Sequence, residues 1–179
     1  MIHRVALLFT LLLQVSPLLA AGPRVTPPKS VNPPIGHSFA PEAFRPMPMT
    51  YVGDLDRLNR DFNLQDDEPI QVRREQFGGT AEPEWLVMSP ERLCGIGGCL
   101  YVLFDGLSAR EIGRFFGTLI VLHRQQNGYP VIQTISRQED GFASVRTFSF
   151  ADRQYQVDDE VLIGEAARLR MESTVEFRR

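Results

Sequence analysis

The sequence is poor in metal-binding residues and has no excess of positive charge. Its 179 residues include two cysteines and three histidines, and 19 basic side chains stand against 22 acidic ones. A metal site would need more soft or imidazole ligands, so we expect no metal or other cofactor. Nucleic-acid binding usually shows as a basic excess, so we expect no nucleic-acid partner. At 43% hydrophobic and 23% charged, the composition is that of one globular domain and excludes collagen, a coiled coil, a wholly disordered polymer or a multi-span membrane protein.

The most apolar run of the chain is too short to cross a bilayer. Residues 1–4 form a basic start, and residues 5–15 are apolar apart from Thr10 and Gln14. Residues 18–22 are then small or apolar, in the order that is typical of a secretory signal peptide. A membrane-spanning helix needs roughly 20 apolar residues, so we expect no stable membrane insertion after cleavage. The pattern predicts a signal peptide over residues 1–21, export by a Sec-type route and a periplasmic or secreted protein.

A proline-rich stretch follows the signal segment. Residues 22–50 hold eight of the thirteen prolines. Proline fixes its own backbone angle, removes a hydrogen-bond donor and biases the preceding residue to extended geometry. The composition predicts a disordered spacer over residues 22–50, which serves as a tether, a ligand for a groove-bearing partner or a solvated leader.

One globular domain is predicted over residues 51–172, with a frayed tail at 173–179. A first amphipathic helix is expected at 54–64, where Leu55, Leu58 and Phe62 share a face. Short apolar runs between turn residues then predict an α+β fold that is mainly antiparallel. We expect a curled meander sheet or a small barrel with one or two short flanking helices. Strands are predicted at 70–77, 85–88, 100–104, 109–116, 118–123, 131–136, 144–150 and 154–157, and a second helix at 161–171.

The loop from Cys94 to Cys99 is the most distinctive motif. In an exported protein, two cysteines without others predict one disulfide. Gly95, Gly97 and Gly98 give the backbone the freedom that so short a bridge requires. A thioredoxin-type centre would need two intervening residues and a different fold context. A phosphate-binding glycine loop would need a lysine that this motif lacks.

Several motifs together resemble a group of small exported proteobacterial proteins of unknown function. They are the Cys-Gly-x-Gly-Gly-Cys loop, an apolar strand after it and a later hairpin with Asn127 and Gly128 at its turn. The similarity covers about residues 90–157 and implies a class and a location, with no activity. Its remaining parts are residues 116–118, Tyr129, Pro130, Phe148, Phe150 and Tyr155.

Candidate catalytic groups are few. His123 is the one imidazole of the predicted domain, and a hydrolytic triad would need it beside a nucleophile. No Gly-x-Ser-x-Gly elbow is present to mark that nucleophile. A cluster of carboxylates before the strands lacks calcium-loop spacing and is expected to be a solvated helix face. The candidate nucleophiles are Ser136, Ser144, Ser149 and a reduced Cys99, and the carboxylates are Asp54, Asp56, Asp61, Asp66, Asp67 and Glu68.

Three functions are compatible with these features. The first is a periplasmic, non-catalytic binding or accessory protein whose partner is an envelope protein or a small ligand. The second is a secreted inhibitor or immunity-type protein that presents the Cys94–Cys99 loop. The third is an envelope hydrolase centred on His123.

Overall fold

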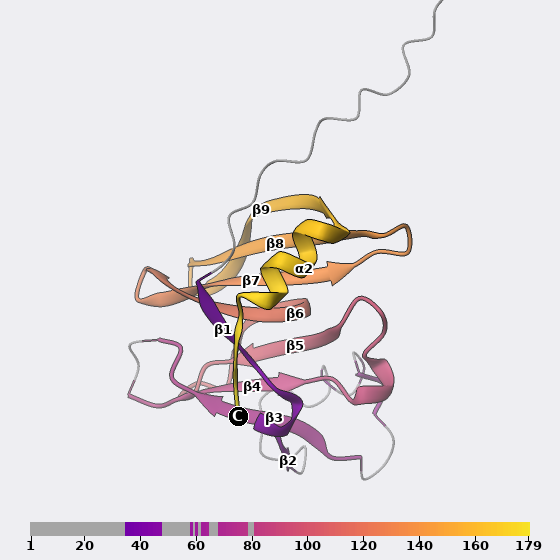
Figure 1. Cartoon of the computed structure of the whole chain (residues 1–179). Helices are drawn as coiled ribbons and strands as arrows, with labels where there is room; N and C mark the ends of the chain where they lie inside the picture. The colour runs from indigo at the N-terminus through magenta and orange to yellow at the C-terminus, as the bar shows by residue number, and fades with distance from the viewer. Residues whose placement is uncertain (1–34, 48–57, 59, 61, 65–67, 79–80) are drawn as a thin grey trace, which may run out of the picture.

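The fold is mainly antiparallel β with one complete helix among the described residues. The computed structural model describes residues 35–47, 58, 60, 62–64, 68–78 and 81–179. Two single-turn 3-10 helices, η1 and η3, accompany the sheet in these parts (Figure 1). The elements are β1 (Gly36–Phe39), η1 (Pro41–Ala43), β2 (Arg45–Met47), β3 (Ile70–Glu75), β4 (Glu84–Met88), η3 (Glu91–Leu93), β5 (Cys99–Phe104), β6 (Glu111–Gln126), β7 (Tyr129–Arg137), β8 (Phe142–Ala151), β9 (Gln154–Gly164), α2 (Glu165–Ser173) and β10 (Glu176–Arg178).

Strands β2 to β9 pair in sequence order, and each pair is antiparallel. This is the order of a meander. The predicted alternative of a small barrel is wrong, because the sheet does not close on itself and β2 and β9 remain its two ends among the described strands. In addition to its neighbours in this order, the second half of β6 pairs with β1, at Val121 and Leu122.

Strand β6 replaces the two strands that were predicted at 109–116 and 118–123. It is one strand of 16 residues that pairs with β5 up to Gly117 and with β7 from Thr118. Gly117 has a φ of +121°, a conformation that side chains disfavour, and a Cβ there would lie 2.5 Å from the carbonyl oxygen of Ile135. Gly117 therefore lets one strand change partners without ending.

The core forms on both faces of strands β4 and β5. Leu86, Met88, Tyr101 and Leu103 belong to one buried cluster, which Phe39 completes from β1. The opposite face contributes a second buried cluster, which also includes two side chains that precede β3, Leu58 and Phe62. Its other members are Ile70, Val72, Val87, Val102 and Phe104. Side chains alternate between faces along a strand, so β4 and β5 each contribute to both clusters, whereas β3 contributes Ile70 and Val72 to the second one.

The same alternation separates two neighbouring phenylalanines on β6. Phe115 is buried, whereas Phe116 points outward and is 42% exposed. Helix α2 covers a third cluster, where Met171 packs with Ile120, Ile135 and Val145.

Three predicted segments differ from the structure. Part of the expected spacer is ordered, because residues 35–47 contain β1, η1 and β2. Proline is tolerated there because Pro41 opens η1 and Pro46 lies in the edge strand β2. The expected C-terminal tail contains β10, which pairs in parallel with β1 (Figure 1).

The predicted helix at 161–171 begins later, since β9 continues to Gly164 before α2 starts. The predicted helix at 54–64 lies mostly outside the described residues; of these, Leu58, Arg60 and Phe62 are helical.

Candidate functional site

His123 does not meet a nucleophile among the described residues. Its side chain is exposed and makes no hydrogen bond to Ser136, Ser144 or Ser149. Cys99 is oxidised in the disulfide and so offers no thiol. Of these candidates, Ser144 instead donates a hydrogen bond of 2.6 Å to a carboxylate oxygen of Glu160. The described residues therefore contain no His123-centred triad.

The imidazole nearest to His123 belongs to a residue that the sequence assigned to the spacer. His37 lies on β1, and its ring centroid is 6.4 Å from that of His123. His37 is only 7% exposed, and neither ring nitrogen has a hydrogen-bond partner among the described residues. Burial lowers the pKa of His37, and the positive charge of Arg178 lowers it further. Burial thus favours the neutral form of the His37 imidazole. The described residues include no cluster of three or more metal-ligating side chains.

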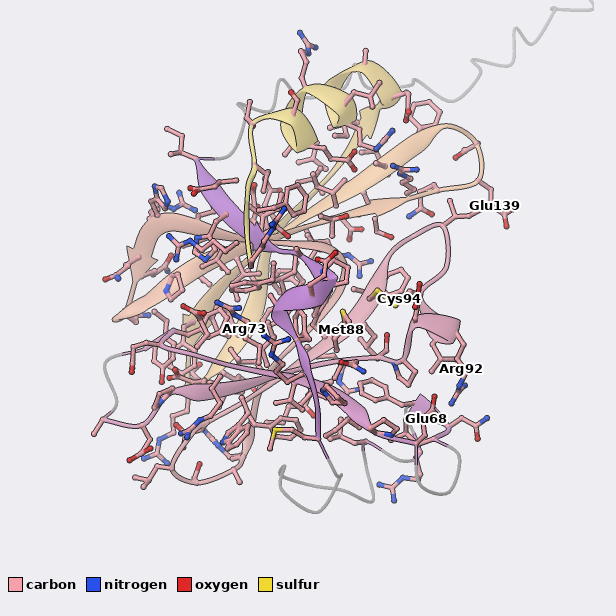
Figure 2. All side chains as sticks on the ribbon, turned by 60° about the horizontal axis from the view of Figure 1, so that its bottom comes forward. Glu68, Arg73, Met88, Arg92, Cys94 and Glu139 are labelled. Carbon is pink, nitrogen blue, oxygen red and sulfur yellow. A yellow bond between two sulfur atoms is a disulfide. The ribbon has the colours of Figure 1, made fainter. Side chains whose placement is uncertain are left out.

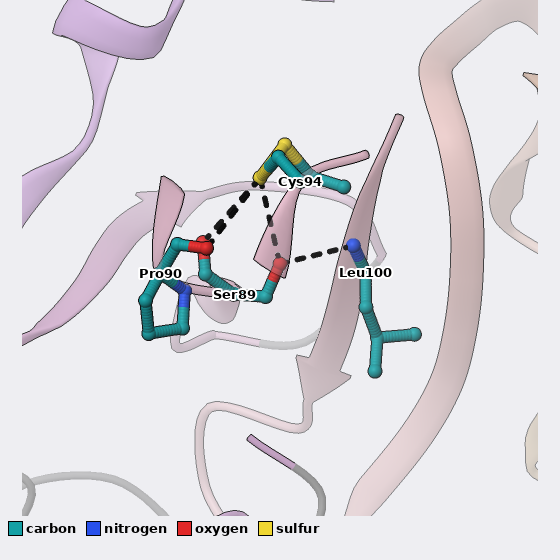
Figure 3. Close-up of a disulfide and its surroundings, with 5 residues drawn as sticks. Ser89, Pro90, Cys94 and Leu100 are labelled. Atoms are coloured by element: carbon teal, nitrogen blue, oxygen red, sulfur yellow. Dashed lines mark hydrogen bonds between the residues drawn. A yellow bond between two sulfur atoms is a disulfide. The ribbon is translucent and has the colours of Figure 1, made fainter. Parts of the chain in front are cut away.

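The predicted disulfide is present between Cys94 and Cys99, in the connection from β4 to β5. Ser89, which is buried, accepts a hydrogen bond of 3.1 Å from the backbone N–H of Leu100 through its hydroxyl. The same hydroxyl lies 3.7 Å from Cys94 Sγ and is the donor of that contact, since a disulfide sulfur carries no hydrogen. Figure 3 shows Ser89 between the disulfide and β5.

The glycines of the loop allow backbone contacts that side chains would block. Gly95 and Gly98 form an isolated antiparallel bridge, with a hydrogen bond of 3.0 Å from Gly98 N–H to Gly95 O. A Cβ on Gly98 would lie 2.5 Å from the carbonyl carbon of Gly117, and one on Gly97 would lie 2.9 Å from the ring of Phe116. The disulfide thus closes the loop at its base, and the loop packs on β6 at Phe116 and Gly117.

An apolar side chain stands at the tip of this closed loop. Ile96 is 78% exposed, although isoleucine is among the residues most often buried. Phe116, beneath Gly97, and Leu93, just before Cys94, are also exposed. We call Leu93, Ile96 and Phe116 the loop patch. A rigid loop with such a tip can contact another protein at little cost in conformational entropy.

A cavity of about 710 Å³ adjoins the disulfide. Met88, Tyr101 and both cysteines line it, together with residues from η1, η3 and the start of β3. In Figure 2, Cys94 and Met88 lie close together, and Glu68 and Arg92 lie next to each other. Glu68 and Arg92 form an ion pair with an N–O distance of 2.7 Å. The disulfide is thus shared by two surface features, the loop patch and this cavity.

Asn127 and Gly128 lie at the tight turn between β6 and β7. Both have positive φ angles, of 54° and 81°. The Asn127 side-chain amide donates a hydrogen bond of 2.7 Å to the carbonyl oxygen of Phe150. Asn127 and Gly128 therefore have a structural role in this turn, and the side-chain amide of Asn127 links the hairpin to β8 by its hydrogen bond.

Sequence reasoning missed His37 and the cavity. His37 could not be recognised because β1 pairs with residues far along the chain. Tyr101 carried a usable signal, since it lies two residues after Cys99 on the same strand and so faces the same side of the sheet.

Comparisons with protein-family models, curated proteins and solved structures find no match for this chain. None of the helices in the described residues is long and apolar enough to span a membrane. The candidate carboxylates before the strands lie outside the described residues, apart from Glu68.

Proposed function

We propose that this chain is an exported, non-catalytic binding or accessory protein of the bacterial envelope, with the loop patch as its contact surface. The observation that carries the proposal is Ile96, an exposed apolar side chain on a loop that a disulfide closes. Exposed apolar side chains that gather at one place often mark a protein interface. The N-terminal sequence pattern supports export, and the disulfide fits an oxidising compartment.

A secreted inhibitor or immunity-type protein is the second candidate, and the same loop favours it. An inhibitor needs an exposed loop that is already rigid before binding, because preorganisation limits the entropy lost on association. The Cys94–Cys99 loop has both properties. The hydrolase candidate gains no comparable support, since no nucleophile meets His123 among the described residues.

Affinity capture from an envelope extract tests the contact surface. The mature chain, its I96D variant and its L169D variant would be compared as bait. Leu169 is a matched control because it is 53% exposed and lies on α2. We expect a partner that the wild type and L169D retain and that I96D loses. Equal capture by all three would show that the loop patch is not the contact surface.

The captured partner then separates the two candidates. If the partner is an enzyme and the mature chain lowers its activity, the inhibitor function is supported. If its activity is unchanged, the accessory function is supported. Cell fractionation of the full-length protein tests export independently, and retention in the cytoplasm would contradict it.

A further inference from the structure

The cavity beside the disulfide has an apolar floor. Met88 on β4 and Tyr101 on β5 are paired neighbours in the sheet, and both are buried. The disulfide adjoins them. Three prolines also line the cavity, Pro41, Pro69 and Pro90. A volume of about 710 Å³ is within the usual range of ligand pockets, roughly 300–1,000 Å³.

Tyr101 provides an unpartnered polar group at this floor. Its side chain is 9% exposed, and its hydroxyl has no hydrogen-bond partner among the described residues. Burial raises the pKa of Tyr101 to about 12, so the hydroxyl is neutral and can both donate and accept. The hydroxyl is open to the cavity that Tyr101 lines, so a ligand there can bond to it.

The charged groups around the cavity are acidic. Glu42 on η1 and Glu91 on η3 are exposed and take part in no ion pair among the described residues. Glu68 also lines the cavity and already pairs with Arg92. None of the described residues that line the cavity is basic. The unpaired charge therefore favours a cation over an anion or a neutral ligand.

We infer that this cavity binds an extended peptide segment that carries lysine or arginine next to apolar residues. The apolar floor of Met88 and the disulfide accommodates aliphatic side chains, including the stems of lysine and arginine. Glu42 and Glu91, which come from two different elements, offer two places for a positive charge along an extended ligand. The Tyr101 hydroxyl can bond the peptide backbone. A ligand larger than one side chain is needed to fill the volume.

This inference is independent of the loop patch. The residues that carry it are Glu42, Glu91 and Tyr101, whereas the proposed partner contact depends on the loop patch of Leu93, Ile96 and Phe116. A variant of one surface leaves the other intact, so the failure of either proposal is visible by itself.

Fluorescence anisotropy with the mature, oxidised chain tests the inference. The probe is a labelled octapeptide of alternating lysine and leucine, and its partner probe has glutamate in place of lysine. We expect the lysine peptide to bind and the glutamate peptide not to bind. The E42Q/E91Q double variant should weaken binding at least about 10-fold, since it removes both unpaired charges. Y101F should weaken it about 3- to 10-fold, the effect of one hydrogen bond.

Glu139→Gln is the matched control. Glu139 is an exposed glutamate on the connection between β7 and β8, and Figure 2 shows it apart from Glu68 and Met88. This variant should bind the lysine peptide as the wild type does. The inference is overturned if E42Q/E91Q binds normally, or if E139Q weakens binding as much, because the attraction would then come from net charge alone. Tight binding of free spermidine without binding of the peptide would also overturn it, by identifying a small polyamine as the ligand.

Discussion

Gly98 rests directly on the backbone of Gly117, so that a Cβ on Gly98 would lie 2.5 Å from the Gly117 carbonyl carbon. Both residues have a positive φ, of +109° and +121°. This contact joins the disulfide loop to the point at which β6 changes partners from β5 to β7. The position of the loop patch therefore depends on two glycines that are far apart in sequence.

Alanine at either glycine should destabilise the fold. We expect Gly98→Ala and Gly117→Ala each to lower the free energy of unfolding by about 1–3 kcal/mol, from backbone strain and the contact. Urea denaturation followed by circular dichroism measures the change. Gly95→Ala is the control, since its Cβ would meet nothing within 4 Å and its φ is not positive. Equal stability of all three variants would contradict the packing described for the loop.

Ser89 should be needed for the connection between β4 and β5. Ser89→Ala removes the hydroxyl that accepts from Leu100 N–H and leaves that donor without its side-chain partner. We expect a loss of about 1–3 kcal/mol in the free energy of unfolding. Ser108→Ala is the comparison, because its hydroxyl bonds Asp105 in an exposed turn and its loss should cost far less. A loss no greater at Ser89 than at Ser108 would rule out this role.

The His37 imidazole should make stability depend on pH. Its pKa in the folded protein is below the ordinary value of 6.5, chiefly through burial and then through Arg178, while Glu75 and Glu176 oppose this effect and His123 adds to it. The unfolded chain therefore binds a proton more readily, and stability falls as pH drops below about 6.5. This contribution is fully present above that pH.

The H37F variant isolates this effect. Phenylalanine keeps the ring that packs edge-to-face on Phe39 at 5.3 Å and removes the titrating group. Unfolding free energies at pH 8, 7, 6 and 5 should fall less for H37F than for the wild type. Parallel curves for the two proteins would show that His37 does not cause the dependence.

Phe39 should be essential although it lies in the proline-rich stretch. It is 5% exposed, packs near Phe44 and Phe77, and lies under the guanidinium of Arg73 at 4.6 Å. Phe39→Ala should cost about 3–5 kcal/mol, as for other buried phenylalanines. Phe177→Ala on β10 is 57% exposed and should change thermal stability little. A mild effect of Phe39→Ala would mean that β1 contributes little to the fold.

Local patterns predicted the central sheet and failed where pairing is distant. Alternation and turn residues predicted β3, β4, β5, β7 and β8 closely, because each of these strands pairs with a neighbour in sequence, whereas β6 was predicted as two strands. Strands β1 and β10 were missed because their pairing joins His37 with Glu176, across most of the chain. The proline content of residues 22–50 led to the prediction of a spacer. The structure nevertheless orders β1, whose Phe39 ring is buried in the core.

For the candidate site, the sequence likewise predicted the local feature and missed the one that depends on distant residues. The two cysteines and the intervening glycines predicted the disulfide, and the disulfide is present. The cavity was not predictable, because Glu42, Met88 and Tyr101 come from three separate elements. Only the pairing of β4 with β5 and the return of η1 over that face bring them together.

Site-directed photo-crosslinking in cells tests the central claim, that the loop patch contacts a partner in the envelope. A photoreactive phenylalanine analogue would replace Ile96 in one strain and Leu169 in another, and the adducts of the two proteins would be compared. The account predicts a discrete adduct from position 96 and none from position 169. No adduct from position 96, or the same adducts from both positions, would contradict it.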